Sequence, residues 1–210
     1  PCPSLLPHNP REPRRVPAAT GGPPRLAAAF ALACELHRGQ IRTKTAKPTV
    51  SHLLAVAALV LEHRGDEDET IAALLHDGPE DCGGRVTLDE IRRRFGPRVA
   101  GIVEGCTDSL AQPAPPWRQR KERYLTHLST ADASTLLVSL ADKVHNVGAL
   151  VLAYRRNGEA LWRRFSTSPE ELLWYYGTLL AVFRENPSGQ REPLVRELAR
   201  ALDELHDLIA

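Results

Sequence analysis

Apolar residues recur at helical spacing through most of the chain beyond residue 25. Residues three and four positions apart share one face of a helix, where they can bury against other helices. The two clearest series are Leu136, Leu140, Val144 and Val147, and Leu194, Leu198, Leu202, Leu205 and Leu208. We find neither the alternation of apolar and polar residues nor the turn signals that strands and hairpins show. The pattern predicts an all-α fold, a bundle of helices around an apolar core.

Proline content and length suggest how the chain is divided. Residues 1–24 hold eight of the 17 prolines, a composition typical of a disordered tail. We expect one domain over residues 25–186, and then an amphipathic helix over residues 187–210 that packs on the domain or on a partner subunit. The apolar runs are shorter than a membrane span, and no signal-peptide core is present. Four cysteines without CxxC spacing fit free thiols in the reducing cytoplasm.

Local signals predict three helix boundaries. The segment Thr87–Glu90 has the form of a capping box that opens a short helix. Ser168 followed by Pro169 marks another helix start, because proline suits the first helical position. Pro79 has no N–H to donate to Leu75, so a helix that contains Leu75 should end before Pro79.

A dense group of polar residues follows the apolar pair Leu74 and Leu75. It consists of His76, Asp77, Glu80 and Asp81. Burying so many acid, base or metal-binding groups is costly without a purpose. Neighbouring side chains on a helix are about 100° apart, so the first two of these can both lean toward one metal ion. A solvated helix end, where acidic clusters usually lie, is the structural alternative.

Two further polar residues stand on apolar helices. His52 begins the apolar run that continues to Leu61, and Asp142 lies next to Leu140 in the first helical series. Polar groups on apolar helices are the expected arrangement of ligands that project into a bundle interior. Two imidazoles and two carboxylates form a donor set that suits Mn, Fe, Zn or Ni better than Ca, which prefers oxygen alone.

These residues resemble the metal ligands of a known family. His52, His76, Asp77 and Asp142 look like the four ligands of the HD superfamily of phosphohydrolases. The surrounding sequence resembles more narrowly the hydrolase domain of the RelA/SpoT family, especially the stand-alone small alarmone hydrolases. The segments that carry the resemblance are His37–Arg42, Pro48–His52, His76–Asp81, Leu140–Asn146 and Leu173–Tyr176. The resemblance implies an HD-domain helical bundle over about residues 25–186, with the metal site in its interior.

The resemblance also implies an activity. Proteins of this family remove the 3′-pyrophosphate from guanosine 3′,5′-bis(diphosphate), ppGpp, or from pppGpp, and release GDP or GTP. Their usual metal is Mn²⁺. A metal at this site would lower the pKa of bound water to about 7 and so supply hydroxide at neutral pH. Glu80 and Asp81 would then be the catalytic acids and bases that position water and move a proton.

Four residues are expected to bind the substrate. Arg42 and Lys44 lie in the loop before the first ligand, and a guanidinium can grip a phosphate with two hydrogen bonds. Asn146 and Tyr175 match family positions near the nucleotide. His37 resembles a position that supports the site rather than binding the metal.

The sequence departs from the family at several places near the substrate. Lys44 is displaced by one position because Thr43 follows Arg42, and Thr49 stands where the family has a tyrosine. Gly78 and Pro79 replace a small apolar pair. These changes keep a second hypothesis open, an HD phosphohydrolase that acts on another phosphorylated nucleotide or cofactor such as NADPH.

A third hypothesis is a non-catalytic binding or regulatory module, which would predict the loss of a ligand. Pyrophosphate transfer is not expected, because the chain has no Gly-rich phosphate loop that ends in Gly-Lys-Ser/Thr. A formal charge of +1 argues against a nucleic acid polymer as partner. The expected partners are a small nucleotide and, in a homo-oligomer, further copies of the chain. No membrane partner is expected.

Overall fold

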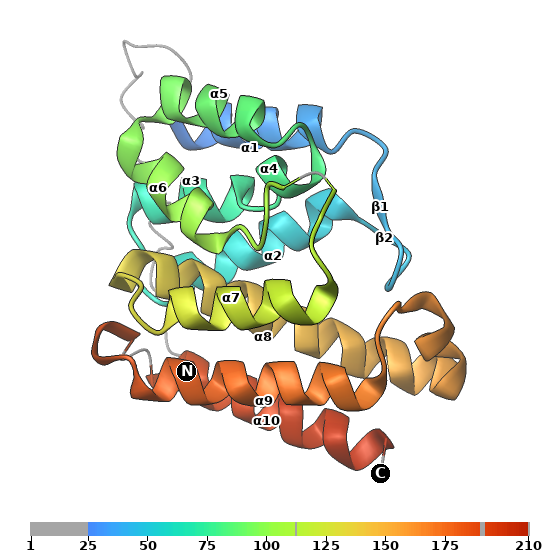
Figure 1. Cartoon of the computed structure of the whole chain (residues 1–210). Coiled ribbons are helices and arrows are strands. Elements are labelled where there is room, and N and C mark those ends of the chain that lie inside the picture. The colour runs from blue at the N-terminus through green and yellow to red at the C-terminus, as the bar shows by residue number, and fades with distance from the viewer. Residues whose placement is uncertain (1–24, 112, 190–191, 210) are drawn as a thin grey trace, which may run out of the picture.

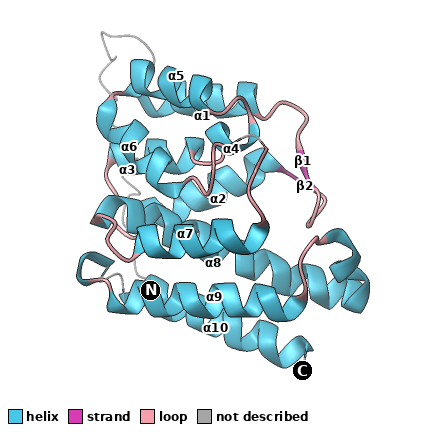
Figure 2. Cartoon of the chain, in the orientation of Figure 1, coloured by secondary structure: helices cyan, strands magenta, loops and turns pink. Residues whose placement is uncertain are grey.

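Helices make up almost all of the fold. The structure is a computed structural model that describes residues 25–111, 113–189 and 192–209, and within them the chain is all-α apart from one short hairpin (Figures 1 and 2). The all-α prediction is confirmed. The tail predicted over residues 1–24 lies outside the described residues.

The bounds of the elements follow the chain order. The helices are α1 (Arg25–Leu36), α2 (Thr49–Glu62), α3 (Glu67–Leu75), α4 (Gly78–Asp81), α5 (Arg85–Phe95), α6 (Pro97–Cys106), α7 (Trp117–Leu128), α8 (Ala133–Asn157), α9 (Pro169–Glu185) and α10 (Glu192–Ile209). The 3-10 helices are η1 (Gly158–Arg164) and η2 (Pro187–Gly189). The strands are β1 (Ile41–Arg42) and β2 (Lys47–Pro48).

The long helix α8 is the centre of the bundle. It packs against α2, α3, α6, α9 and α10, while Figure 1 shows α1 and α5 at one end of the molecule and α9 with α10 at the other. The predicted stripe of α8 is buried throughout. The segment Ala133–Arg164 is long and apolar enough to cross a membrane by length and composition, but 72% of its most apolar window is buried inside the fold.

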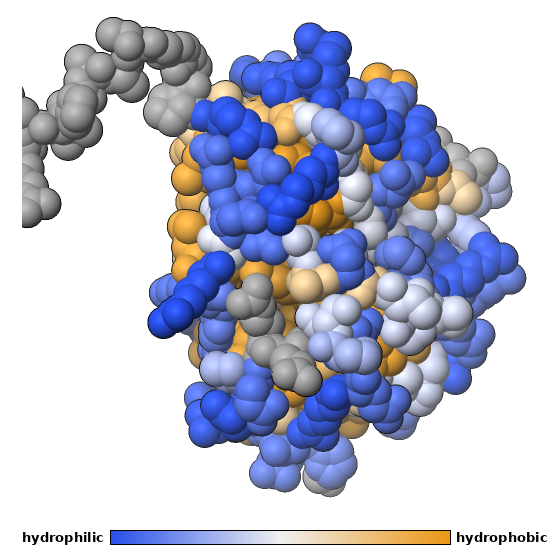
Figure 3. All heavy atoms as spheres, turned by 90° about the vertical axis from the view of Figure 1, so that its left-hand side faces the viewer, coloured by the Kyte–Doolittle hydropathy of each residue, from blue (hydrophilic) through white to orange (hydrophobic). Residues whose placement is uncertain are grey.

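The last helix, α10, packs its apolar stripe on α8 and α9. Leu194, Leu198, Leu202 and Leu205 are buried in the same core as the rest of the bundle. Opposite this stripe the helix is polar. Most of the molecular face in Figure 3 is hydrophilic, and hydrophobic atoms show along one edge and in gaps between hydrophilic ones. The division of the chain at residue 186 stays a prediction.

Two of the three predicted helix boundaries are confirmed. At α9 the Ser168 side chain accepts a hydrogen bond from the Glu171 backbone, and Pro169 is the first helical residue. Helix α3 ends at Leu75, and the chain starts again as α4, with Pro79 in its first turn. His76 and Asp77 lie between the two helices, and both keep right-handed helical backbone angles.

The prediction for α5 is wrong. The helix begins at Arg85 and not after Thr87, because Gly83 and Gly84 adopt positive φ angles of 111° and 61° and turn the chain directly into it. The Thr87 hydroxyl donates to the Cys82 carbonyl instead of capping a helix. Glycines adopt such angles without the steric penalty that other residues incur.

The sequence also gave no hairpin signal, yet β1 and β2 pair antiparallel, with Ile41 opposite Pro48 and Arg42 opposite Lys47. Two-residue strands are too short to show an alternating pattern. The hairpin carries Arg42 on β1 and Lys44 in its turn, and Arg42 Nη2 donates a hydrogen bond to Asn146 on α8.

Candidate functional site

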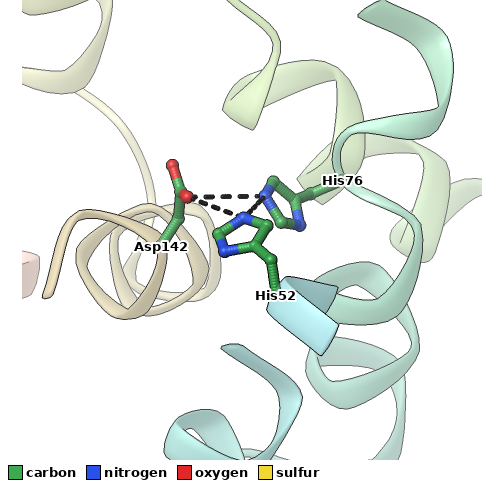
Figure 4. A group of neighbouring side chains, drawn as sticks. All are labelled: His52, His76 and Asp142. Carbon is green, nitrogen blue, oxygen red and sulfur yellow. Dashed lines mark hydrogen bonds and ion pairs between the residues drawn. The ribbon is translucent and has the colours of Figure 1, made fainter. Parts of the chain in front are cut away.

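His52, His76 and Asp142 meet in the interior from three separate parts of the chain (Figure 4). His52 lies near the start of α2, His76 directly follows α3, and Asp142 lies on α8. All three side chains are buried, and one ligand atom of each lies within 4.8 Å of the others. His52 Nε2 is 3.4 Å from His76 Nε2 and 3.2 Å from Asp142 Oδ1.

Asp77 borders this group. Its Oδ1 lies 3.1 Å from His76 Nε2, and its Oδ2 lies 3.4 Å from His52 Nε2. Its side chain is 27% exposed and also faces Arg42, whose Nη1 is 3.5 Å from Oδ2. The four residues predicted as ligands therefore lie together, and we call them the metal-type group. Within it, ligand atoms of His52, His76 and Asp142 are all close to one another.

The far nitrogens of the two imidazoles are already occupied. His76 Nδ1 lies 2.8 Å from the carbonyl of Ala73, which can only accept a hydrogen bond, so Nδ1 carries the proton. His52 Nδ1 lies 2.7 Å from His145 Nδ1. Burial, and then the neighbouring His52, lower the pKa of His145 to about 4, so His145 is neutral at pH 7 and can accept from His52. Both Nε2 atoms then turn their lone pairs toward the carboxylates.

This arrangement places acceptors against acceptors. Two imidazole lone pairs and the oxygens of Asp77 and Asp142 share a small buried volume, which is unfavourable without a proton or a metal cation between them. Ligands about 2.1 Å from one transition metal lie about 3.0 to 3.4 Å apart, and the separations from His52 Nε2 are 3.2 to 3.4 Å. The donor set and its spacing fit a divalent transition metal.

In the absence of metal, a proton takes this role. Burial alone would lower the pKa of His76, but the carboxylates of Asp77 and Asp142 outweigh it and raise this pKa to about 10. Burial opposes ionisation of both carboxyls, but His76 and His52 hold the pKa of Asp77 well below its ordinary range, and the Lys143 cation together with both histidines does the same for Asp142. A metal ion that enters must therefore displace the proton of His76.

Asp142 is held at both of its carboxylate oxygens. Its Oδ2 lies 2.5 Å from Lys143 Nζ, and Asn146 Nδ2 donates to its Oδ1 at 2.6 Å. The side-chain oxygen of Asn146, Oδ1, in turn accepts a hydrogen bond from Arg42 Nη2 at 2.6 Å. Asn146, predicted to bind substrate, thus links Arg42 on the hairpin to Asp142 on α8.

The two predicted acids lie on the short helix α4, next to the metal-type group. The Asp108 backbone N–H points to Glu80 Oε2 at 3.4 Å, while Gln40 donates to Asp81 Oδ2 at 2.9 Å. Burial raises the pKa of Glu80, and the nearby Asp108 raises it further. Burial and the charge of Asp77 raise the pKa of Asp81. Both carboxyls are thus closer to their protonated form than ordinary surface acids.

Two adjoining cavities open beside these residues. The larger, of about 340 Å³, is lined by His76, Asp77, Asp142, Glu80 and Asp81, and the smaller has a volume of about 140 Å³. Six residues line both cavities and so connect them: Arg42, Lys44, Lys121, Lys143, Asn146 and Tyr175. All four residues predicted to bind substrate are in this shared wall.

Lys121 and Lys143 were not among the predicted site residues. Lys121 Nζ lies 5.0 Å from the centre of the Tyr175 ring and 2.9 Å from Asp108 Oδ2. Lys143 directly follows Asp142, and this adjacency was the signal that could have placed it at the site. Lys121 lies in a segment rich in basic and aromatic residues, a composition that is also typical of a solvated helix. These two lysines, with Arg42 and Lys44, line the smaller cavity, and no carboxylate of the described residues lines it with them, so a phosphorylated anion can bind there.

Comparison with known proteins agrees with this geometry. A family described as "HD domain" matches residues 29–166. A guanosine-3′,5′-bis(diphosphate) 3′-pyrophosphohydrolase of Aquifex aeolicus is 37% identical over 122 residues, which are 58% of this chain and 17% of that protein. The bifunctional (p)ppGpp synthase/hydrolase SpoT of Escherichia coli is 34% identical over 134 residues, 60% of this chain and 18% of SpoT. The chain thus spans less than a fifth of the length of these relatives.

Two solved structures share the fold. A crystal structure of the Listeria monocytogenes protein lmo0812 has a TM-score of 0.66 and 26% identity, and the match covers 74% of this chain and 99% of that one. A metazoan ortholog of SpoT that hydrolyzes ppGpp has a TM-score of 0.65 over 90% of this chain and 97% of its own, and at 23% identity it shows the fold alone. Because the family match spans well over half of the chain and includes all the residues of the metal-type group, the chain belongs to the HD domain family, within which it resembles hydrolase domains of the RelA/SpoT type.

Proposed function

We propose that this protein is a metal-dependent pyrophosphohydrolase that removes the 3′-pyrophosphate of guanosine 3′,5′-bis(diphosphate) and of its pentaphosphate form. The observation that carries the proposal is the buried group of facing acceptors, which opens into two adjoining cavities that share four cationic side chains. Relatives named for this activity at 34–37% identity support the choice of substrate.

We assign the metal to His52, His76, Asp77 and Asp142, and Mn²⁺ is the metal proposed from the resemblance. When bound, a divalent cation polarises a phosphoryl group and makes water more acidic. His145 and the Ala73 carbonyl keep the two imidazoles in the tautomers that leave Nε2 free for it. Lys143 and Asn146 hold the Asp142 carboxylate in place.

The remaining residues act on the substrate. Arg42, Lys44 and Lys121 bind the phosphate oxygens, and their charge offsets the charge that develops on the pyrophosphoryl group while it passes from the ribose 3′-oxygen to water. Glu80 and Asp81 are the acid and base: their raised pKa values suit groups that accept a proton from water and return it to the leaving oxygen. Tyr175, buried between the two cavities, supports the nucleoside.

A second candidate keeps the same machinery but takes another phosphorylated nucleotide, such as NADPH. Thr49 favours it, because this residue lines the larger cavity in place of an aromatic side chain, and its buried hydroxyl has no hydrogen-bond partner among the described residues. A substrate hydroxyl or phosphate could pair with this group. A non-catalytic module is the third candidate.

The deciding experiment is a product-release assay with the full chain and Mn²⁺, on ppGpp, pppGpp, NADPH and plain nucleoside diphosphates. We expect GDP and intact pyrophosphate in equal amounts from ppGpp, and no release from GDP. Asp77→Asn is the matched inactive control, since it keeps the shape and loses the charge. Faster phosphate release from NADPH would establish the second candidate, and no release from any compound the third.

The same preparation tests the remaining proposals. Replacing Mn²⁺ by Zn²⁺, Ni²⁺ or Mg²⁺ after chelation tests the choice of metal. Light scattering shows whether the chain forms a homo-oligomer. Location in the cytoplasm is proposed, because that is where a nucleotide of this kind is available.

A further inference from the structure

A chain of hydrogen bonds leads from a buried histidine to one of the two candidate acids. His37 Nδ1 lies 2.5 Å from Gln40 Oε1, and Gln40 Nε2 lies 2.9 Å from Asp81 Oδ2. The His37 side chain is only 2% exposed, whereas Gln40 and Asp81 line the larger cavity. The chain therefore joins the interior of the fold to the edge of the candidate active site.

The chemistry of the groups sets the direction of these bonds. An ionised carboxylate can only accept, so the amide N–H of Gln40 must face Asp81. The amide oxygen then faces His37, which can satisfy it only with a proton on Nδ1. His37 Nε2 is left buried without a hydrogen-bond partner among the described residues. The fold tolerates this unpaired nitrogen while the ring directs its donor at Gln40.

The backbone around Gln40 is held on both sides. Its N–H donates to the His37 carbonyl at 3.0 Å, and its own carbonyl accepts from the Thr49 N–H at 3.0 Å. Between them Gly39, with a φ of 71°, makes the turn that joins α1 to β1. Cys82, next to Asp81, donates its S–H to the Leu36 carbonyl at 3.3 Å. These contacts fix α4 against the end of α1.

The two acids are thus held by different parts of the molecule. Glu80 faces the backbone of Asp108, after α6, while Asp81 is bonded to Gln40, in the turn after α1. A carboxylate that is half-exposed would otherwise sample several rotamers, and holding it in one improves its geometry for proton transfer.

We propose that Gln40 is a positioning residue, which His37 orients and which holds the Asp81 carboxylate toward the reacting phosphate. The inference rests on the proposed hydrolase function, since it assigns Gln40 to that same site. The sequence predicted a supporting role for His37 but no role for Gln40, because the contact of Gln40 with Asp81 joins positions 41 residues apart.

A double-mutant cycle tests the coupling. Gln40→Met keeps the length of the side chain and removes the donor, and it should lower kcat about tenfold with KM and metal affinity within twofold of the wild type. In the Asp81→Asn background the same change should cost less than twofold, because the group it positions is already lost. An equal loss in both backgrounds overturns the proposal. Gln119→Met, an exposed glutamine of α7 outside both cavities, is the matched control and should be as active as the wild type.

Substitutions of His37 test the other end of the chain. His37→Asn keeps an N–H donor near the position of Nδ1 and should keep most of the rate, while His37→Leu should lose about as much as Gln40→Met. Equal activity of the two His37 variants would overturn the orienting role. If His37→Leu does not fold, the orienting role is judged from the kcat of His37→Asn relative to the wild type and from the Gln40 double-mutant cycle.

A measurement independent of substrate separates this inference from the proposed function. The ¹⁵N shifts of the His37 ring in the metal-loaded full chain should show the Nδ1–H tautomer, and an Nε2–H tautomer overturns the proposal. If the wild type hydrolyses another nucleotide but no guanosine 3′-pyrophosphate, the proposed substrate fails, and the cycle is measured with the nucleotide that is hydrolysed.

Discussion

Asp142→Asn should abolish metal binding and also destabilise the metal-free protein. Asp142 and Lys143 form a buried ion pair at 2.5 Å, with side chains 7% and 11% exposed. The asparagine keeps the shape of the side chain but leaves the lysine cation without its counter-charge. It also removes the anion that raises the pKa of His76 together with Asp77.

The magnitude follows from the burial of the pair. Removing one partner of a buried pair costs about 3 to 5 kcal/mol. We expect the lower end, about 3 kcal/mol, because Lys143 keeps the face of the Tyr124 ring, 5.1 Å away, and borders a cavity that water can reach. With a urea m-value of about 2 kcal/mol/M, the unfolding midpoint falls by about 1.5 M. A domain of ordinary stability, about 5 to 15 kcal/mol, stays folded.

The assay is urea unfolding followed by circular dichroism, in the presence of a chelator so that bound metal adds nothing to the free energy of unfolding. Asp142→Asn combined with Lys143→Met removes both charges and should recover most of the loss, to within about 1 kcal/mol of the wild type. Neither variant should bind metal in a titration. If the single and the double variant are equally stable, the unpaired cation is not the cause, and the reasoning is refuted.

Three further changes test the site. In the metal-free protein His76, with its pKa raised to about 10, is protonated at neutral pH. Metal binding should therefore release a proton, and the apparent Kd for the metal should fall about tenfold per pH unit between about pH 6.5 and 8. Calorimetry in buffers of different ionisation enthalpy measures the released proton. A pH-independent Kd would contradict this. Glu80→Gln should keep the metal and lose about 100-fold or more in kcat; loss of metal instead would make Glu80 a ligand. Arg42→Ala should raise KM about tenfold with a smaller effect on kcat, whereas an unchanged KM would place the phosphate elsewhere; Arg38→Ala, exposed just before the hairpin, is its control.

The sequence predicted those features that depend on local pattern. The stripe of α8 and the capping box at Ser168 are properties of short segments, and the structure has them where they were expected. The helix start predicted at Thr87 was wrong because Gly83 and Gly84, with positive φ angles, turn the chain into the helix two residues earlier. The metal-type residues could be recognised because polar groups on apolar helices are rare unless they converge.

Contacts between distant segments could not be read in this way. His145 orients His52, Lys121 borders the larger cavity, and Gln40 donates to Asp81. Each of these contacts depends on how segments that are distant in the sequence pack together around α8. A period of 3.6 residues says which face a residue shares, but not which residue of another helix it meets. The supporting residues of the site are therefore a property of the packed bundle.

The helices that build the core are also those that bring the acceptors together. Burying His52 and Asp142 side by side is unfavourable without a cation, so the packing of α2 on α8 is incompletely satisfied until something positive binds. A proton on His76 can supply part of this charge, whereas a zinc finger without metal has no such substitute and unfolds. The bundle can therefore fold first and exchange that proton for a metal afterwards, and its large apolar core, independent of the ion, makes this order possible.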